Sequence, residues 1–125
     1  MIIHYLTVED AIAFHADQLD MFGGAKGLRD EGALAAAMFR PQSGYYDDRI
    51  AEAAALWESL ALNHPFVDGN KRVCVTVTFA FLIINKIRIT AQDDDVWTFM
   101  LDLFEKGEFS FANLDAWLRA NTEPV

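Results

Sequence analysis

The sequence predicts an all-α fold in which six helices form a compact structure around a buried central helix. Three observations predict it. Apolar residues recur at helical spacing along most of the chain. Glycine, proline and capping residues separate the segments that show this spacing. The length of 125 residues, with 53% hydrophobic and 23% charged residues, favours one globular domain spanning residues 1–125.

The charge balance and the cysteine count restrict the setting and the partners. The net charge of −9 gives a surface that repels phosphate backbones, which argues against a direct nucleic-acid partner. A single cysteine rules out a disulfide framework and favours a reducing, cytoplasmic location. The first residues do not have the pattern of a signal peptide, and the longest apolar run, near residues 73–84, is too short to span a bilayer. We therefore expect no membrane association.

The first helix is expected from Val8 to Asp20. Thr7 and Asp10 form a capping-box pattern with Asp in place of Glu, and the glycine pair at 23–24 ends the helix. His15 lies on the apolar stripe of this helix. We favour a core histidine with a hydrogen-bond partner over a catalytic role, because no partner for catalysis is visible.

The next two segments are a turn and a second helix. Residues 23–30 contain three glycines but no known phosphate-binding pattern, so a plain turn is favoured over a phosphate cradle. Asp30 caps the second helix, which stops before Pro41. In the loop that follows, Tyr45 and Tyr46 either form a docking surface for a partner or comprise one packed and one solvated ring.

The third helix, from about Ile50 to Asn63, must end at His64 because proline follows at once. The apolar run near residues 73–84 has strand propensity in its first half. We assign it to the buried central helix, because it is long and apolar all round, with a start near Asn70 and a left-handed stop at Asn85.

The C-terminal part is predicted to add two helices. A short extended segment at residues 87–90 precedes a helix that starts at three aspartates, residues 93–95, where acidic groups suit the helix dipole. Gly107 ends this helix, and Ser110 caps the last one. Residues 121–125 are expected to fray.

Residues 64–72, with the sequence His-Pro-Phe-Val-Asp-Gly-Asn-Lys-Arg, concentrate polar chemistry between apolar helices. His64 is a candidate general base, and Asp68 is a candidate Mg²⁺ ligand. Four residues are candidates for phosphate binding at a helix N-terminus: Gly69, Asn70, Lys71 and Arg72. Together these groups suit phosphoryl or nucleotidyl transfer.

Three other interpretations of residues 64–72 explain the loop less well. His64 and Asp68 are four residues apart, a spacing that suits zinc on a helix, but Pro65 and Gly69 interrupt any helix and no third ligand is visible. A purely structural loop explains Asp68 as a cap but leaves the base and the cations unexplained. A hydrolase of the covalent type needs a Ser or Cys nucleophile, and the loop has neither.

The loop resembles the signature of the Fic/Doc superfamily, His-x-Phe-x-Asp/Glu-Gly/Ala-Asn-Gly/Lys-Arg, with every defining position filled. Residues 22–24, 27–32 and 40–42 are similar to the N-terminal half of death-on-curing (Doc) toxins, and the resemblance covers about residues 1–90. It implies the helical Fic/Doc fold and the toxin of a toxin–antitoxin system. Carried over by position, His64 is the base, Asp68 holds Mg²⁺, and residues 70–72 bind phosphates.

The resemblance implies a choice between two reactions of ATP. Fic enzymes transfer AMP to a target hydroxyl, whereas Doc toxins are kinases that phosphorylate a threonine of elongation factor Tu and arrest translation. Lys71 stands where AMP-transferring members carry Gly, and Val75 replaces their second motif arginine. Both features favour the kinase. AMP transfer and a catalytically silent partner-binding module remain alternatives.

The resemblance also implies regulation by a second protein. The Ser/Thr-x-x-x-Glu-Gly/Asn motif of autoinhibited Fic proteins is absent, since Glu31 is preceded four residues earlier by Gly27. Inhibition is therefore expected in trans, from a small antitoxin whose disordered C-terminal segment folds onto this surface. Tyr45 and Tyr46 occupy the position of the target-docking flap of the family, which favours the docking interpretation.

Overall fold

The computed structural model of the chain describes residues 2–125. Within that range it has six α-helices, one short 3₁₀ helix and a two-stranded antiparallel sheet, as the sequence predicts except for the sheet. The elements are α1 (Val8–Phe22), α2 (Glu31–Phe39), η1 (Arg40–Gln42), α3 (Arg49–Asn63), α4 (Asn70–Ile84), β1 (Ile87–Ile89), α5 (Asp93–Glu105), α6 (Phe111–Ala120) and β2 (Thr122–Pro124).

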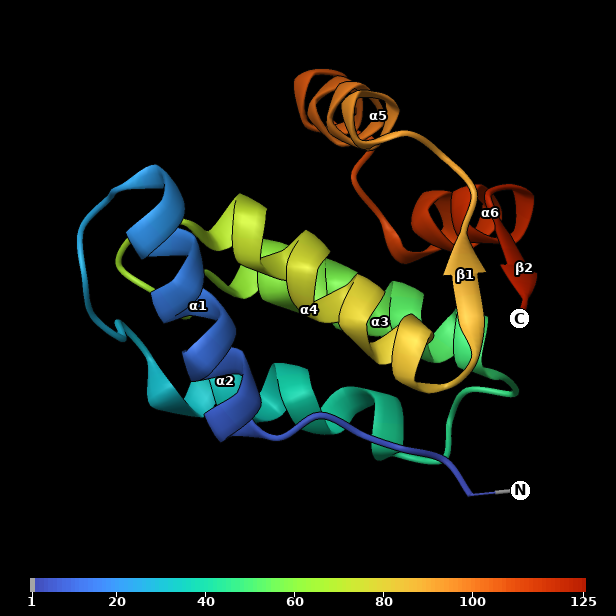
Figure 1. The fold of residues 1–125 in the computed structure, drawn as a ribbon, viewed down its shortest axis with the longest axis horizontal. Helices are drawn as coiled ribbons and strands as arrows, with labels where there is room; N and C mark the ends of the chain where they lie inside the picture. Colours follow the sequence, from blue (N-terminus) through green and yellow to red (C-terminus); the bar gives the residue numbers. More distant parts are fainter. Residues whose placement is uncertain (1) are drawn as a thin grey trace.

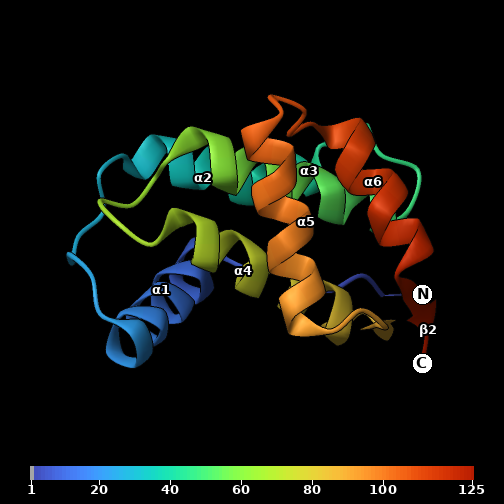
Figure 2. The same ribbon diagram turned by 90° about the horizontal axis from the view of Figure 1, so that it is seen from above.

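Helices α3 and α4 run through the middle of the molecule, and the other helices surround them (Figures 1 and 2). α3 packs against α2, α4 and α6, and most of its residues are buried. Its run of alanines, residues 53–55, leaves room for neighbouring helices to approach closely. Trp57 is fully buried at the centre, where the rings of Phe79, Phe99 and Trp117 meet it edge-on.

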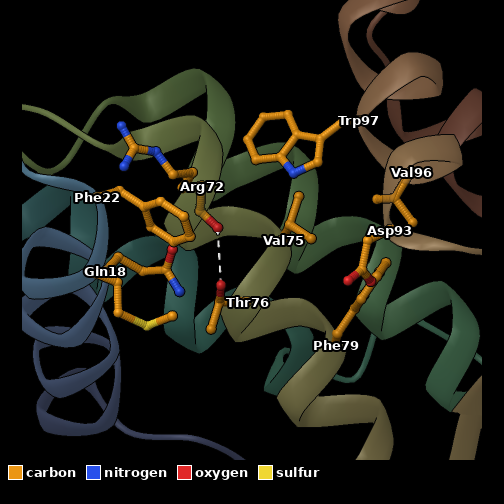
Figure 3. A pocket seen from close by; sticks show the side chains of 10 residues that line it. Gln18, Phe22, Arg72, Val75, Thr76, Phe79, Asp93, Val96 and Trp97 are labelled. Atoms are coloured by element: carbon orange, nitrogen blue, oxygen red, sulfur yellow. Dashed lines mark hydrogen bonds between the residues drawn. The ribbon is translucent and has the colours of Figure 1, made fainter.

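α4 is the expected central helix, but its burial is one-sided. Val73, Cys74 and Val77 are fully buried, whereas 62% of Ile83 is exposed near the C-terminal end. The outward side of α4 is only partly covered, because a cavity lined by residues of α1, α4 and α5 opens beside it (Figure 3). Burial of Cys74 raises the pKa of its thiol to about 12, which disfavours the reactive thiolate.

The predicted N-terminal caps are confirmed. Thr7 and Asp10 form the reciprocal capping box, and α1 extends to Phe22 before Gly23 ends it. The side chains of Asp30 and Ser110 accept hydrogen bonds from the third residue of α2 and α6, respectively. These contacts are local, which is why sequence patterns predict them.

Two predictions about the C-terminal part are wrong. Residues 121–125 do not fray, because β2 pairs with β1 and the N–H of Val125 donates to the main-chain oxygen of Lys86 at 2.9 Å. Asn85 is not left-handed; the residue after it, Lys86, takes that conformation at φ 64°, and the Asn85 amide instead bonds to the main chain of Phe81 and His4. No helix among the described residues has the length and hydropathy that a bilayer crossing requires.

Candidate active site

His64 stands at the junction between α3 and the loop. It has left-handed backbone geometry at φ 47°, and its side chain is exposed. The buried Pro65 prevents α3 from continuing, as the sequence predicts, and the left-handed residue turns the chain away from the helix axis. Because this conformation is unfavourable for a residue with a side chain, other parts of the chain must hold it.

Residues 23–30, between α1 and α2, supply that support. Arg29 donates from its side chain to the main-chain oxygens of His64 (2.7 Å) and Asn63 (2.9 Å). The main-chain N–H groups of Arg29 and Asp30 both donate to the oxygen of Pro65, and the N–H of Val67 donates to Gly27. The prediction of a plain turn therefore missed the role of this segment, which binds the main chain of residues 63–67.

Asp68 is exposed but tightly held. Its Oδ2 accepts a hydrogen bond from the N–H of Ala25 at 3.0 Å, and its Oδ1 accepts one from the N–H of Gly69 at 2.8 Å. These two donors hold the pKa of the Asp68 carboxyl below its usual range. The carboxylate therefore stays ionised at neutral pH, with lone pairs free for a cation.

The side chain of Asn70 is engaged within the loop itself. Its Oδ1 accepts from the N–H of Phe66 at 3.0 Å, and its Nδ2 donates to the oxygen of the same residue at 2.9 Å. Phe66 is 2% exposed, so the pair fastens the loop to the core. Among the described residues, no acceptor bonds to the main-chain N–H groups of Asn70, Lys71 or Arg72, which open α4.

The two cations of the loop point to different neighbours. Nζ of Lys71 lies 4.7 Å from the ring centre of Phe104 on α5. The guanidinium of Arg72 lies 5.1 Å from the ring centre of Phe22 at the end of α1. Both contacts are cation–π interactions, and they place positive charge on two sides of the N-terminus of α4.

A cavity of about 460 Å³ lies beside Arg72, between the end of α1, α4 and the start of α5 (Figure 3). Trp97 and Val96 face Val75 across it, and Phe22 and Arg72 lie on its other side. Sequence patterns did not reveal this cavity, because its walls come from three helices. Its full lining is Gln18, Met21, Phe22, Arg72, Val75, Thr76, Phe79, Asp93, Val96 and Trp97.

His15 reaches the loop from α1. It is buried, and Nε2 lies 2.7 Å from the main-chain oxygen of Asp68. The prediction of a hydrogen-bonded core histidine is confirmed, but its partner belongs to the loop of residues 64–72. Sequence patterns do not reveal this partner, because it is 53 positions away.

The two tyrosines of the 41–49 loop differ in environment. Tyr45 is 83% exposed, whereas Tyr46 is half-buried, accepts a hydrogen bond from Nε of Arg40 at 2.7 Å and packs on Phe111. One ring is therefore packed and the other solvated. A docking role for this pair stays a prediction.

The donor set of the loop fits a metal carried by a substrate better than a resident metal. Among the described residues, no cluster of three or more His, Cys, Asp or Glu side chains could hold a metal ion. In the described part of the chain, the zinc interpretation therefore gains no third ligand. A single ionised carboxylate such as Asp68 suits Mg²⁺, which takes its other ligands from phosphates and water.

Comparison with known proteins places the site in a family context. A family model described as "Fic/DOC family" matches residues 5–82. The chain is 45% identical over 78 residues to "Toxin Doc" from Mycolicibacterium smegmatis, which covers 58% of this chain and 60% of that protein. It is 26% identical over 91 residues to "Protein kinase doc" from Escherichia phage P1, which covers 70% of this chain and 72% of that protein.

Proposed function

The chain belongs to the Fic/DOC family, and from that premise we propose that it is a Doc-type toxin that transfers the γ-phosphate of ATP to a threonine hydroxyl of elongation factor Tu. One observation carries the choice of reaction. Lys71 occupies the motif position where AMP-transferring members have Gly, and its long side chain projects beside the N-terminus of α4. The relative from phage P1 that is named a protein kinase supports the same choice.

In the proposed reaction, His64 accepts the proton of the threonine hydroxyl as that oxygen attacks the γ-phosphorus. A bond forms between the threonine oxygen and phosphorus, the bond from the γ-phosphorus to the β–γ bridging oxygen breaks, and ADP leaves. The imidazole is exposed, so a protein hydroxyl has access to it. Its left-handed backbone, held by Arg29, fixes the direction from which it acts.

Asp68 and the N-terminus of α4 would hold the phosphates. Magnesium bound with ATP neutralises phosphate charge, and Asp68 is the side chain that would take it. The free N–H groups of Asn70, Lys71 and Arg72, together with the helix dipole, favour an anion at this end of α4. The guanidinium of Arg72 adds a charged donor on the α1 side.

The cavity beside Arg72 is the place for the nucleoside of ATP. Its volume of about 460 Å³ lies within the usual range for small-ligand sites. Trp97, Phe22 and Phe79 offer aromatic surface for a base, while Gln18 and Asp93 offer hydrogen-bonding groups. Val75, at the position of the second arginine of AMP-transferring members, makes this wall apolar, which suits a base rather than a phosphate.

A labelling experiment tests the reaction. The protein is incubated with elongation factor Tu, Mg²⁺ and ATP labelled at either the γ- or the α-phosphate. We expect label on the target from the γ position alone. Label from the α position alone would replace the kinase with AMP transfer, and transfer from neither would leave a silent partner-binding module.

The variant His64→Ala separates catalysis from binding. We expect it to abolish both γ-phosphate transfer and growth arrest, because the base is lost, while the fold is kept. His4→Ala is the matched control, since His4 is also an exposed histidine but precedes α1. Growth arrest by His64→Ala equal to that of the unchanged chain would contradict the enzyme.

Regulation completes the proposal. A small antitoxin would inhibit the chain in trans by covering the surface around residues 64–72. Three apolar side chains on this surface are exposed: Phe22 by 60%, Met21 by 70% and Val67 by 53%. If a small protein is encoded beside the gene of this chain, we expect its co-expression to relieve growth arrest, and arrest that persists would contradict this partner.

A further inference from the structure

We propose that His15 is a positioning residue for phosphate transfer, which orients the peptide between Asp68 and Gly69 and thereby the carboxylate that takes magnesium. The inference rests on the function proposed above. His15 does not face the substrate in that scheme, so its action is through Asp68. His15 belongs to α1 and lies outside the family motif of residues 64–72.

The hydrogen bond from His15 defines which atom carries the proton. Nε2 lies 2.7 Å from the main-chain oxygen of Asp68, and a carbonyl oxygen can only accept. Nε2 must therefore be the donor. The residue is 5% exposed, so water does not compete for this carbonyl as it would at the surface.

The imidazole has little freedom to turn. Its ring stacks on Phe66 with a centroid distance of 3.9 Å and an interplanar angle of 8°. Phe66 is itself buried, and both of its main-chain polar groups bond to the side chain of Asn70. The donor from α1 is thus fixed relative to the loop.

The orientation of one peptide transmits this constraint to the carboxylate. In a trans peptide the C=O and the N–H point in opposite directions. With the oxygen of Asp68 directed to His15, the N–H of Gly69 points the other way, where it donates to Oδ1 of Asp68 at 2.8 Å. Ala25 binds the other carboxylate oxygen, so rotation of the peptide would remove one of its two donors.

Two substitutions separate the hydrogen bond from the packing. His15→Phe keeps a ring against Phe66 and removes the donor. His15→Gln removes the ring and keeps an amide N–H with similar reach. His4→Gln is the control, because His4 is exposed at the N-terminal end of the chain. The three variants and the unchanged chain are compared in thermal melting, in Mg²⁺ titrations of γ-phosphate transfer, and in binding of Mg²⁺ with a non-hydrolysable ATP analogue.

We expect His15→Phe to change mainly the Mg²⁺ requirement of transfer and His15→Gln to change mainly the melting temperature. His15→Phe should melt close to the unchanged chain but need about 10- to 100-fold more Mg²⁺ for half-maximal transfer, as is typical when a residue supporting a metal ligand is lost. His15→Gln should melt at a lower temperature and keep a Mg²⁺ requirement close to that of the unchanged chain. A merely structural histidine would give Mg²⁺ requirements that follow melting temperature, and that result would overturn the proposal.

Binding of the non-hydrolysable ATP analogue tests the role of His15 even if no phosphate is transferred. If the unchanged chain transfers no γ-phosphate, the function proposed above fails, and the Mg²⁺ dependence of analogue binding is compared in the same variants. Weaker Mg²⁺ dependence of binding in His15→Phe but not in His15→Gln supports positioning of Asp68. Equal dependence in all variants, or no Mg²⁺ effect in the unchanged chain, overturns it.

Discussion

Nε of Arg29 donates a hydrogen bond of 2.7 Å to the main-chain oxygen of His64, the residue whose backbone is left-handed at φ 47°. Nη2 of the same side chain bonds to the oxygen of Asn63. One guanidinium thus satisfies two carbonyls at the end of α3 and places a positive charge where the helix dipole favours it. The position of the candidate base therefore depends on a residue of the preceding loop.

Replacing Arg29 by lysine should test this dependence. Lysine keeps the charge but lacks the two-pronged geometry, so we expect a loss of about 1–2 kcal/mol in the free energy of unfolding and about a tenfold fall in kcat for γ-phosphate transfer. Chemical denaturation and steady-state kinetics measure the two effects. Arg88→Lys, at the exposed residue of strand β1, is the control. Unchanged kinetics in Arg29→Lys would show that His64 holds its position unaided.

Gly24 is predicted to be irreplaceable because of its closeness to Asp68. A Cβ added at Gly24 would lie 2.8 Å from Oδ2 of Asp68, and its φ of +125° is itself unfavourable for other residues. We expect Gly24→Ala to lower the free energy of unfolding by about 1–3 kcal/mol and to raise the Mg²⁺ requirement of transfer.

Gly23→Ala separates strain from displacement. Gly23 also has positive φ, at +76°, but a Cβ added to it would meet nothing within 4 Å. We expect Gly23→Ala to cost stability through backbone strain and to leave the Mg²⁺ requirement unchanged. The same shift in Mg²⁺ requirement in both variants would remove the carboxylate contact as its cause.

The N–H groups of Ala25 and Gly69 lower the pKa of the Asp68 carboxyl, and this predicts how the stability of the folded state changes with pH. A group whose pKa is lower in the folded state stabilises that state above its unfolded value of about 3.8, and this contribution is lost as the pH falls through the folded pKa. We expect the carboxyl carbon of Asp68 to titrate below about 3.8 by NMR.

The amide of Ala25 should titrate together with the carboxyl of Asp68, since the two are hydrogen-bonded at 3.0 Å. In Asp68→Asn this amide should show no titration in the same range. A midpoint for Asp68 at or above the ordinary value would contradict the hydrogen-bonded carboxylate.

Trp97 provides a test of the nucleoside cavity. Stacking of a base on an aromatic side chain contributes about 1–3 kcal/mol when measured by alanine substitution, so Trp97→Ala should weaken ATP binding by about 5- to 150-fold. Binding of tripolyphosphate should not change, because it has no base. Calorimetry with both ligands measures the difference.

Leu101→Ala is the control for the Trp97 variant. It shortens an apolar side chain on the same helix, α5, that is 47% exposed and does not line the cavity. We expect both ligands to bind it as they bind the unchanged chain. Equal weakening of ATP and tripolyphosphate by Trp97→Ala would place the base elsewhere.

The helix ends could be predicted from sequence because their causes are local. Thr7, Asp30 and Ser110 cap the helices that follow them, and Pro65 ends α3. Each of these contacts spans only a few residues. The 3.6-residue period of apolar side chains then sufficed for the all-helical class.

The errors share a different cause. Residues 121–125 contain no strand pattern, and they form β2 only because β1 lies beside them and offers free main-chain groups. The residue Lys86 takes the left-handed position expected of Asn85, since the side chain of Asn85 is engaged by His4 and Phe81. In both cases a partner distant in sequence decides the local conformation.

The sequence by itself determined that residues 64–72 form a polar loop between a helix that ends at His64 and one that begins at Asn70. The tertiary structure alone decided which of its polar groups are free. Packing of α1 and its following loop against this segment binds the main chain of Asp68 through His15 and its carboxylate through Ala25. Sequence patterns define elements through contacts between near neighbours, whereas the hydrogen bonds of an active site join residues that only the packing of helices brings together.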